Sequence, residues 1–200
     1  MKSRQWTYLI ALGALALVPA AQAQDDQAAE LAKKLSNPLA ALISVPIQCN
    51  YDKFGGANDG ASVSRLTVQP VIPFSLNTDW NLISRTIVPL IDQRDFPVAA
   101  SNASGLGDIT ASLFFSPKAP TAGGWIWGAG PVFLLPTATK DVLGAEKWGL
   151  GPTAVVLKQT GPWTVGMLAN HIWSVAGNDS RNDVNATFLQ PFLTYTTKTQ

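Results

Sequence analysis

The chain has 200 residues, a formal net charge of +1 and only 14% charged residues, whereas charged side chains make up about 25% of an ordinary soluble domain. Hydrophobic residues reach 46%, and 7 tryptophans are among them. This balance argues against an ordinary cytosolic domain, and the near-zero net charge removes the electrostatic case for a nucleic-acid partner. The one cysteine, Cys49, excludes a disulfide framework within one chain, and we expect it to be a small apolar filler.

Residues 1–23 are predicted to be a signal peptide. The start is positively charged, an apolar run extends from Tyr8 to Val18, and residues 21–23 fit the small-x-small cleavage pattern. The apolar run is shorter than the roughly 20 residues of a spanning helix. The protein is therefore expected to be exported, with a mature chain that begins near Gln24.

Residues 24–41 are predicted to be a short helix followed by a linker. Apolar side chains recur at helical spacing between Gln27 and Leu35, and the Ser36-Asn37-Pro38 sequence ends the pattern. The simpler interpretation is a solvated linker or a periplasmic lid. The alternative is a helix that enters a barrel and narrows it, and the sequence leaves both open.

Residues 42–200 are predicted to form one β-domain. The hydrophobic pattern changes to period two, with turn residues about every ten positions. Most of the segments have the roughly 9 to 11 residues that a transmembrane strand needs. The eight expected strands are Leu42–Tyr51, Val63–Leu76, Trp80–Ile91, Gly107–Phe115, Trp125–Leu135, Trp148–Lys158, Trp163–Ser174 and Asn185–Thr196.

The predicted strands have one apolar and one polar face. In the second strand Leu66, Ile72 and Phe74 share a face, while Arg65 and Thr67 lie on the other. The fourth strand alternates in the same way, and the facing of the third and eighth is left open. No later stretch suits a spanning helix, so membrane insertion would require a closed barrel. Apolar outside and polar inside is typical of an outer-membrane protein, and the expected fold class is an all-β, antiparallel transmembrane β-barrel of about eight strands.

Prolines are the main objection to this fold, because each removes one donor from a strand ladder. They are expected at bulges, near strand ends, or where the missing donor would face water in the lumen. Those within the predicted strands are Pro46, Pro70, Pro73, Pro89, Pro131, Pro152 and Pro191.

Long and short connections alternate along the chain, as expected when hairpins face two different compartments. Tryptophans lie where the predicted strands meet these connections. Those next to the short or intermediate turns, which we place on the periplasmic side, are Trp80, Trp125, Trp127 and Trp163. Trp148 and Trp173 border long loops and are predicted to form the outer girdle. All six are interpreted as membrane-interface anchors.

No catalytic residue is expected. His171 and Ser174 are three residues apart on one predicted strand and therefore point to opposite faces, although a serine on another strand could still partner the histidine. Asp179 and Asp183 lack the spacing of a calcium-binding loop and are interpreted as a solvated connection. Neither a metal site nor a cofactor is expected.

Four residues are the candidates for contact with a solute in the lumen: Arg65, Gln69, Arg85 and Asp108. Charges that line a lumen tune its selectivity. Because the charges of this group are of mixed sign, they predict no preference between anions and cations.

Six long segments carry a resemblance to a known family: Ala29–Pro46, Gln69–Pro89, Ser104–Lys118, Gly124–Thr139, Glu146–Gly177 and Phe188–Thr199. They resemble the bacterial outer-membrane proteins labelled MetA-pathway of phenol degradation, whose members are also named transporter or neuromedin U. The resemblance covers nearly all of the mature chain. It implies an outer-membrane β-barrel that helps small, often aromatic, molecules enter, with no catalytic residues. Because members of the family are longer, the barrel is expected to be incomplete here.

The expected function is a passive channel or transporter for small, aromatic or hydrophobic molecules in the outer membrane of a Gram-negative bacterium. Its expected partners are outer-membrane lipid, the barrel-assembly machinery during biogenesis, and an unknown small-molecule cargo. The alternatives are a structural or adhesive barrel with a filled lumen, a lipid-modifying barrel enzyme, which the facing of His171 and Ser174 disfavours, and a soluble β-sandwich.

Overall fold

A computed structural model describes residues 28–54, 60–96 and 101–197. The predicted signal peptide lies outside the described residues. A helix covers residues 28–35, and a short 3-10 helix, η2, covers Asp141–Leu143. The strands are β1 (Ile47–Lys53), β2 (Ser62–Val68), β3 (Val71–Ser75), β4 (Trp80–Arg94), β5 (Ala103–Leu106), β6 (Ile109–Pro117), β7 (Trp125–Leu135), β8 (Lys147–Thr160), β9 (Trp163–Gly177) and β10 (Asn185–Tyr195).

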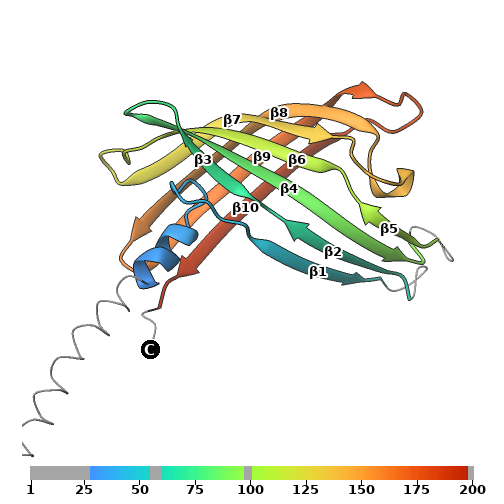
Figure 1. Ribbon diagram of the computed structural model, residues 1–200, viewed down its shortest axis with the longest axis horizontal. Coiled ribbons are helices and arrows are strands. Elements are labelled where there is room, and N and C mark those ends of the chain that lie inside the picture. Colours follow the sequence, from blue (N-terminus) through green and yellow to red (C-terminus); the bar gives the residue numbers. More distant parts are fainter. Residues whose placement is uncertain (1–27, 55–59, 97–100, 198–200) are drawn as a thin grey trace, which may run out of the picture.

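The strands form one antiparallel sheet in which neighbours in sequence are neighbours in space. The order is β1-β2-β4-β6-β7-β8-β9-β10, and β3 and β5 also pair with β4. The sheet curls into a half-barrel, with β1 and β10 at its two edges (Figure 1). The predicted antiparallel all-β fold and its eight-strand path are therefore confirmed, and β7 has the predicted bounds. Among the described residues, none of the helices has both the length and the apolar character needed to span a membrane.

The connections separate into two groups at opposite ends of the sheet. Because all neighbours are antiparallel, the long connections lie at one end, which we call the long-loop end, and the short ones lie at the short-turn end (Figure 1). The residue 28–35 helix lies at the short-turn end. The connections alternate between the two ends as predicted, although the connection 118–124 at the short-turn end is as long as the connection 178–184 at the other end.

Strand β8 shows most clearly that the sheet has two different faces. From Lys147 to Leu157 its odd-numbered residues are buried and its even-numbered residues are exposed, as the period of two requires. We call the concave, buried side the inner face and the other side the outer face. The exposed residues of β8, among them Trp148, Leu150 and Val156, are apolar, so the outer face has the apolar character that the sequence predicts.

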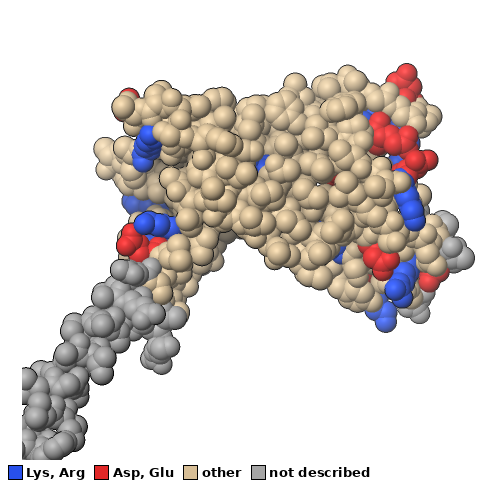
Figure 2. Space-filling model, viewed as in Figure 1, with Lys and Arg blue, Asp and Glu red and all other residues tan. Residues whose placement is uncertain are grey.

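Charged side chains gather at the two ends of the sheet, while the middle of the face shown in Figure 2 has almost none. Large apolar side chains cover the outer face between these ends. They include Leu66, Ile72, Phe74, Leu90, Phe115, Leu150, Val156, Val165 and Met167, each between 37% and 50% exposed. The outer face is therefore an apolar belt bordered by two charged rims.

The long second strand predicted for residues 63–76 is divided at Pro70 into β2 and β3. Val68 pairs with Val88 and Val71 pairs with Arg85, so the register against β4 is the same on both sides of the break. Pro70 donates no hydrogen bond, although its carbonyl still accepts one from the Thr86 amide at 3.0 Å. One proline thus interrupts the ladder without changing the path of the strand.

Pro89 lies beside an irregularity of the partner strand, as predicted. Leu90 pairs with Leu106 of β5, whereas Ile87 pairs with Thr110 of β6, so the register shifts by one residue in between. The Gly107 amide donates to the Pro89 carbonyl at 2.8 Å. This is a β-bulge, and it re-aims the chain where β5 becomes β6.

Pro131 and Pro152 lie neither at a bulge nor near a strand end, the first two places expected for prolines, but face each other in the middle of β7 and β8. The β6–β7 ladder stops at Ser112–Val132 and resumes at Phe115–Ala129 without a change of register. The β8–β9 ladder has the same kind of gap after Leu150–Trp173. These prolines occupy gaps rather than bulges. The gaps follow from the missing N–H of proline, and the glycine before each proline lets the next strand approach closely, because a Cβ on Gly130 or Gly151 would overlap one of its carbonyl oxygens.

We expect Gly151→Ala to lower the free energy of unfolding by about 1–3 kcal/mol, the usual cost of overpacking. The added Cβ would overlap the carbonyl oxygen of His171, and backbone has to move to make room. Urea-dependent unfolding measures the change. Gly123→Ala is the matched control, since a Cβ there meets only ordinary contacts with Trp125 and Thr121; equal stability of the two variants would show that the strands do not approach as closely as described.

Cys49 is exposed on β1, so its interpretation as a buried apolar filler is wrong. The reason is that β1 is an edge strand, with only β2 beside it, and its residues are nearly all exposed. Cys49 pairs with Leu66, an outer-face residue, and therefore belongs to the apolar belt.

Candidate functional site

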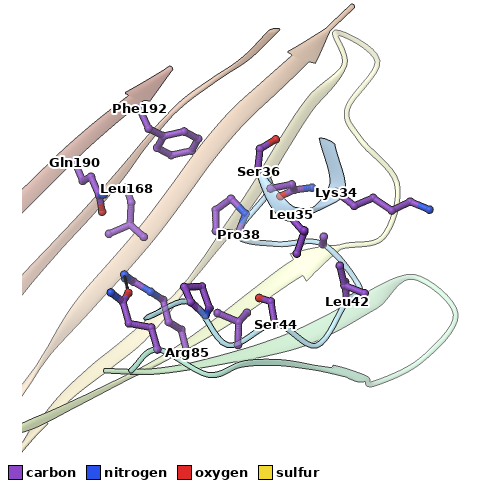
Figure 3. Close-up of a pocket in the computed structure, with 15 residues that line it drawn as sticks. Lys34, Leu35, Ser36, Pro38, Leu42, Ser44, Arg85, Leu168, Gln190 and Phe192 are labelled. Carbon is purple, nitrogen blue, oxygen red and sulfur yellow. Dashed lines mark hydrogen bonds between the residues drawn. The ribbon is translucent and has the colours of Figure 1, made fainter. Parts of the chain in front are cut away.

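The N-terminal segment, residues 34–46, lies against the inner face and closes a cavity there. The cavity has a volume of about 200 Å³, and Figure 3 shows the segment's side chains opposite those of β9 and β10, with Arg85 at the lower margin. Its lining from the sheet is Gln69, Val71, Arg85, Leu168, Gln190 and Phe192. We take this cavity as the candidate functional site.

Leu39 anchors the segment in the core of the molecule. It is 5% exposed and packs in one cluster with Val71, Ile83, Phe114, Val155, Leu157 and Leu168 from five strands of the inner face. A Cβ on Gly128 would contact both methyl carbons of Leu39, so the glycine leaves the room that the leucine fills. The cluster is the main apolar core, and the segment supplies one of its side chains.

Polar contacts fix the start of the same segment to the short-turn end of β8 and β9. The Ser36 hydroxyl lies 2.9 Å from the hydroxyl of the buried Thr164. Gln159 donates from Nε2 to the Lys33 carbonyl at 2.9 Å. Residues 33–39 thus contact the inner face, and Leu39 is buried there. Period-two patterns describe strands and carry no signal for a side chain inserted by a non-strand segment.

Gln69 and Arg85 are the two predicted lumen residues that the structure brings together. Arg85 donates from Nη2 to Oε1 of Gln69 at 2.6 Å, and both side chains line the cavity. Arg85 is on β4, whose inner face also carries the fully buried Ile83. The sequence left the facing of this strand open, and the structure places Arg85 inward.

Arg65 lies away from this pair, in a second hollow nearer the long-loop end. That hollow has a volume of about 230 Å³ and is lined by Asp52, Phe54, Val63, Arg65, Ile91, Gln93, Phe96, Val142 and Leu143. Phe54 and Phe96 stack there with ring centroids 4.8 Å apart. Val142 and Leu143 of η2 belong to the lining, so the long loop between β7 and β8 contributes to it.

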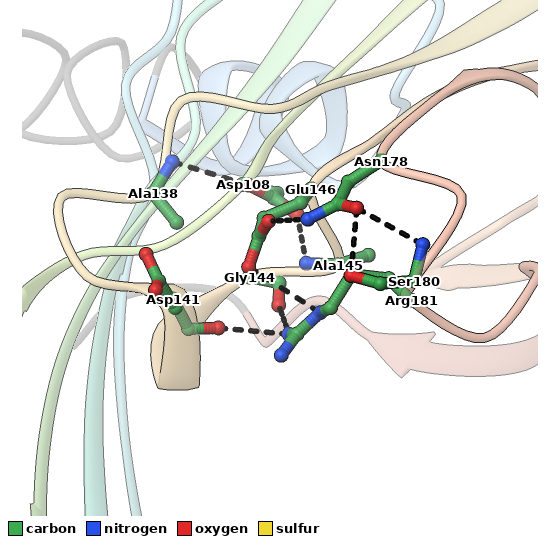
Figure 4. Close-up of polar contacts among 9 residues, drawn as sticks. All are labelled: Asp108, Ala138, Asp141, Gly144, Ala145, Glu146, Asn178, Ser180 and Arg181. Carbon is green, nitrogen blue, oxygen red and sulfur yellow. Dashed lines mark hydrogen bonds and ion pairs between the residues drawn. The ribbon is translucent and has the colours of Figure 1, made fainter.

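Asp108 lies among the long loops, where backbone donors hold its carboxylate. Its two carboxylate oxygens accept hydrogen bonds from the backbone amides of Ala138 and Ala145, at 3.1 and 2.6 Å. Figure 4 shows this carboxylate held between the two loop segments. Asp108 therefore keeps its negative charge, and two backbone donors fix its carboxylate in place.

The long loops are joined to each other by a polar cluster around Arg181 (Figure 4). Arg181 donates to the carbonyls of Asp141 and Gly144 and forms an ion pair with Glu146 at 3.4 Å. Asn178 donates to the second Glu146 oxygen at 2.6 Å. These contacts link the β7–β8 and β9–β10 loops. Residues 178–183 are mostly exposed, as expected of a solvated loop, and are also cross-linked to the neighbouring loop.

A buried lysine meets an exposed aspartate at the same end. Lys147 is 6% exposed, and its Nζ lies 3.1 Å from Asp183. The Ser174 hydroxyl donates to the same Asp183 oxygen at 3.0 Å. The hydrogen bond from Lys147, that from Ser174 and the lysine's positive charge together hold the pKa of Asp183 below its ordinary value of 3.8.

Acid is expected to release this contact only below about pH 3.8. A carboxylate with a depressed pKa in the folded state stabilises the fold above its unfolded-state pKa, and that contribution is lost as the pH falls through the folded-state pKa. Carbon-13 chemical shifts of the Asp183 carboxyl measure the titration. In Lys147→Met the pKa of Asp183 should rise toward its ordinary value. An unchanged pKa would show that Lys147 does not hold the carboxylate.

His171 and Ser174 lie on opposite faces of β9, as their spacing predicts. The His171 Nδ1 lies 2.7 Å from the Thr187 hydroxyl, and its ring packs on Trp173 with centroids 4.1 Å apart, whereas Ser174 contacts Asp183. Within the described part of the chain no three His, Cys, Asp or Glu side chains are grouped closely enough to hold a metal ion.

The six tryptophans predicted as anchors all have exposed side chains at the ends of strands. Trp80, Trp125, Trp127 and Trp163 lie toward the short-turn end, where Trp80 and Trp127 make an edge-to-face contact at 5.9 Å. Trp148 and Trp173 lie toward the long-loop end. Both groups therefore border the apolar belt.

No family model, curated protein or solved structure matches this chain.

Proposed function

We propose that this protein is an outer-membrane β-barrel that acts as a passive channel or transporter for small molecules, exported by residues 1–23 and inserted by the barrel-assembly machinery. The single observation that carries the proposal is the apolar belt of the outer face. Side chains such as Phe74, Leu150 and Met167 are between 42% and 50% exposed there. A soluble monomer rarely exposes a contiguous apolar surface of this extent, whereas lipid would cover it.

The tryptophans support the same proposal. Aromatic side chains collect at membrane–water interfaces because one part of the ring system is apolar and another part forms hydrogen bonds. In this chain they border the belt on both sides, and charged residues lie beyond them. On this proposal the short-turn end faces the periplasm and the long-loop end faces outward, as in outer-membrane barrels generally.

The inner face supports transport rather than a purely structural role. It carries the polar side chains Gln69, Arg85 and Gln159 and two hollows, so a solute has polar surface to contact. The family resemblance of the sequence points the same way, toward small and often aromatic molecules. We assign no catalytic step and no cofactor.

A structural or adhesive barrel with a filled lumen is the second candidate, and one observation favours it. Leu39 and its neighbours fill the inner face beside Val155 and Leu157, which narrows the space that a solute could use. This candidate predicts the same location in the membrane and no conductance.

Planar bilayers separate the two candidates. We expect the purified full chain to give ion current above that of protein-free bilayers, and liposomes that contain it to swell in small sugars. If no ion current is seen at any voltage, and co-flotation of protein and lipid shows that the protein is inserted, only the structural or adhesive barrel with a filled lumen remains. Recovery of the protein in the aqueous fraction without detergent would contradict both.

A further inference from the structure

Arg85 has an unusual electrostatic position among the cations of the inner face. A guanidinium carries five N–H donors. In the part of the chain that the structure describes, the side chain of Arg85 forms one hydrogen bond, to Gln69 at 2.6 Å. Among the described residues no carboxylate lies within 4.0 Å of it, whereas Lys147 has Asp183 at 3.1 Å. The charge of Arg85 is thus half-buried without an anion beside it.

The surroundings of Arg85 have a polar and an apolar part. The amides of Gln69 and Gln190 and the hydroxyl of Ser44 line the cavity near the N-terminal segment. Leu168 and Phe192 form a wall from β9 and β10, and Pro38 and Val71 add to the apolar lining. Figure 3 shows Leu168, Gln190 and Phe192 on one side of the cavity, with Arg85 below them and Pro38 opposite.

We propose that this cavity binds a small organic anion, with its carboxylate at Arg85 and a short apolar body against Leu168 and Phe192. The planar fork of arginine fits a carboxylate through two parallel hydrogen bonds, and the donors not used by Gln69 supply them. The cavity of about 200 Å³ limits the ligand to a few carbon atoms beyond the carboxylate. The binding site does not depend on the proposed function. Only the further idea that this anion is the transported molecule rests on it.

The charges that line this cavity agree with this ligand. Among the described residues its lining holds two cations, Lys34 and Arg85, and no carboxylate. Lys34 is paired with Glu30 at 2.8 Å, so Arg85 is the cation without a carboxylate partner, and the cavity favours anions over cations.

Binding is tested on the detergent-solubilised full chain by calorimetry, with hexanoate and its neutral analogue hexanamide as probes. We expect saturable binding of hexanoate and at least about tenfold weaker binding of hexanamide, because a hydrogen bond to a charged group is worth roughly one decade or more in affinity. Arg85→Gln should reduce the affinity for hexanoate to that for hexanamide. Arg85→Lys keeps the charge and should retain part of the preference.

Arg94→Gln is the matched control. It removes the same charge from the same strand, but Arg94 is on the outer face, and its side chain is 71% exposed beside Asp92. We expect its preference for hexanoate to equal that of the wild type. Continued binding of hexanamide by Arg85→Gln shows that the cavity is still folded.

Equal affinity of the wild type for the two probes, or a preference that survives Arg85→Gln, would overturn the site. Conductance tells this failure apart from failure of the proposed function. If the protein conducts but shows no preference for hexanoate, the channel proposal stands and the anion site is wrong. If it binds hexanoate at Arg85 but never conducts, the anion site stands and the channel proposal is wrong.

Discussion

Met167→Arg is expected to destabilise the protein in phospholipid vesicles by about 2–4 kcal/mol, the cost of an arginine on the lipid face near the bilayer midplane. Met167 is 46% exposed on the outer face of β9, between the tryptophans Trp163 and Trp173 that mark the two ends of the strand. It pairs with Val156 and Pro191 and has apolar surface around it. Urea-dependent unfolding from vesicles measures the loss.

The same substitution has a different consequence if water covers this face. An exposed side chain replaced by another of similar length then changes stability by no more than about 0.5 kcal/mol. Val175→Arg is the matched control, since Val175 is on the same strand at the long-loop end and is 63% exposed. We expect it to cost about 0–1 kcal/mol, as near an interface. Equal effects at the two positions would contradict a lipid-covered belt.

Leu39→Ala is expected to release the N-terminal segment from the inner face. Truncating a buried leucine costs about 2–5 kcal/mol through lost burial and the cavity left behind, and Leu39 is 5% exposed among Ile83, Phe114 and Leu157. A loss of about 2 kcal/mol raises the undocked population roughly thirtyfold. Trypsin cleavage after Lys33 and Lys34 should accelerate by that factor.

Leu31→Ala provides the comparison for this release. Leu31 is in the helix of residues 28–35 and is 48% exposed, so its truncation removes little buried surface. Its cleavage rate should stay close to that of the wild type. If trypsin cleaves Leu39→Ala no faster than Leu31→Ala, Leu39 does not anchor the N-terminal segment. In that case the two variants should also have the same conductance in planar bilayers.

The strands could be predicted because each carries its own signal. Alternation of apolar and polar side chains, together with the turn residues between the segments, located the eight strands, and the apolar run from Trp125 to Leu135 was found with the bounds that β7 has. The same alternation placed Arg65 and Gln69 on one side of the second predicted strand. On β4 the alternation is weak, because its inner face carries both Ile83 and Arg85. The sequence therefore left open which side chains of this strand point inward.

Features that depend on two distant segments could not be predicted in the same way. Leu39 belongs to no strand, and only the fold brings it to Gly128 and Phe114. The role of Asp108 depends on amides of Ala138 and Ala145, whose position is set by the loop between β7 and β8. The sequence therefore identified candidates for the site but not the cavity that joins Arg85 to the N-terminal segment.

Contact between the tryptophans and lipid is the central claim, and quenching of their fluorescence by brominated phospholipids tests it most directly. The six tryptophans of the described chain all border the apolar belt at its two ends. We expect strong quenching by bromine placed near the headgroup and weaker quenching by bromine near the end of the acyl chain. An unchanged fluorescence with both lipids, in vesicles that carry the protein, would contradict the membrane-spanning fold.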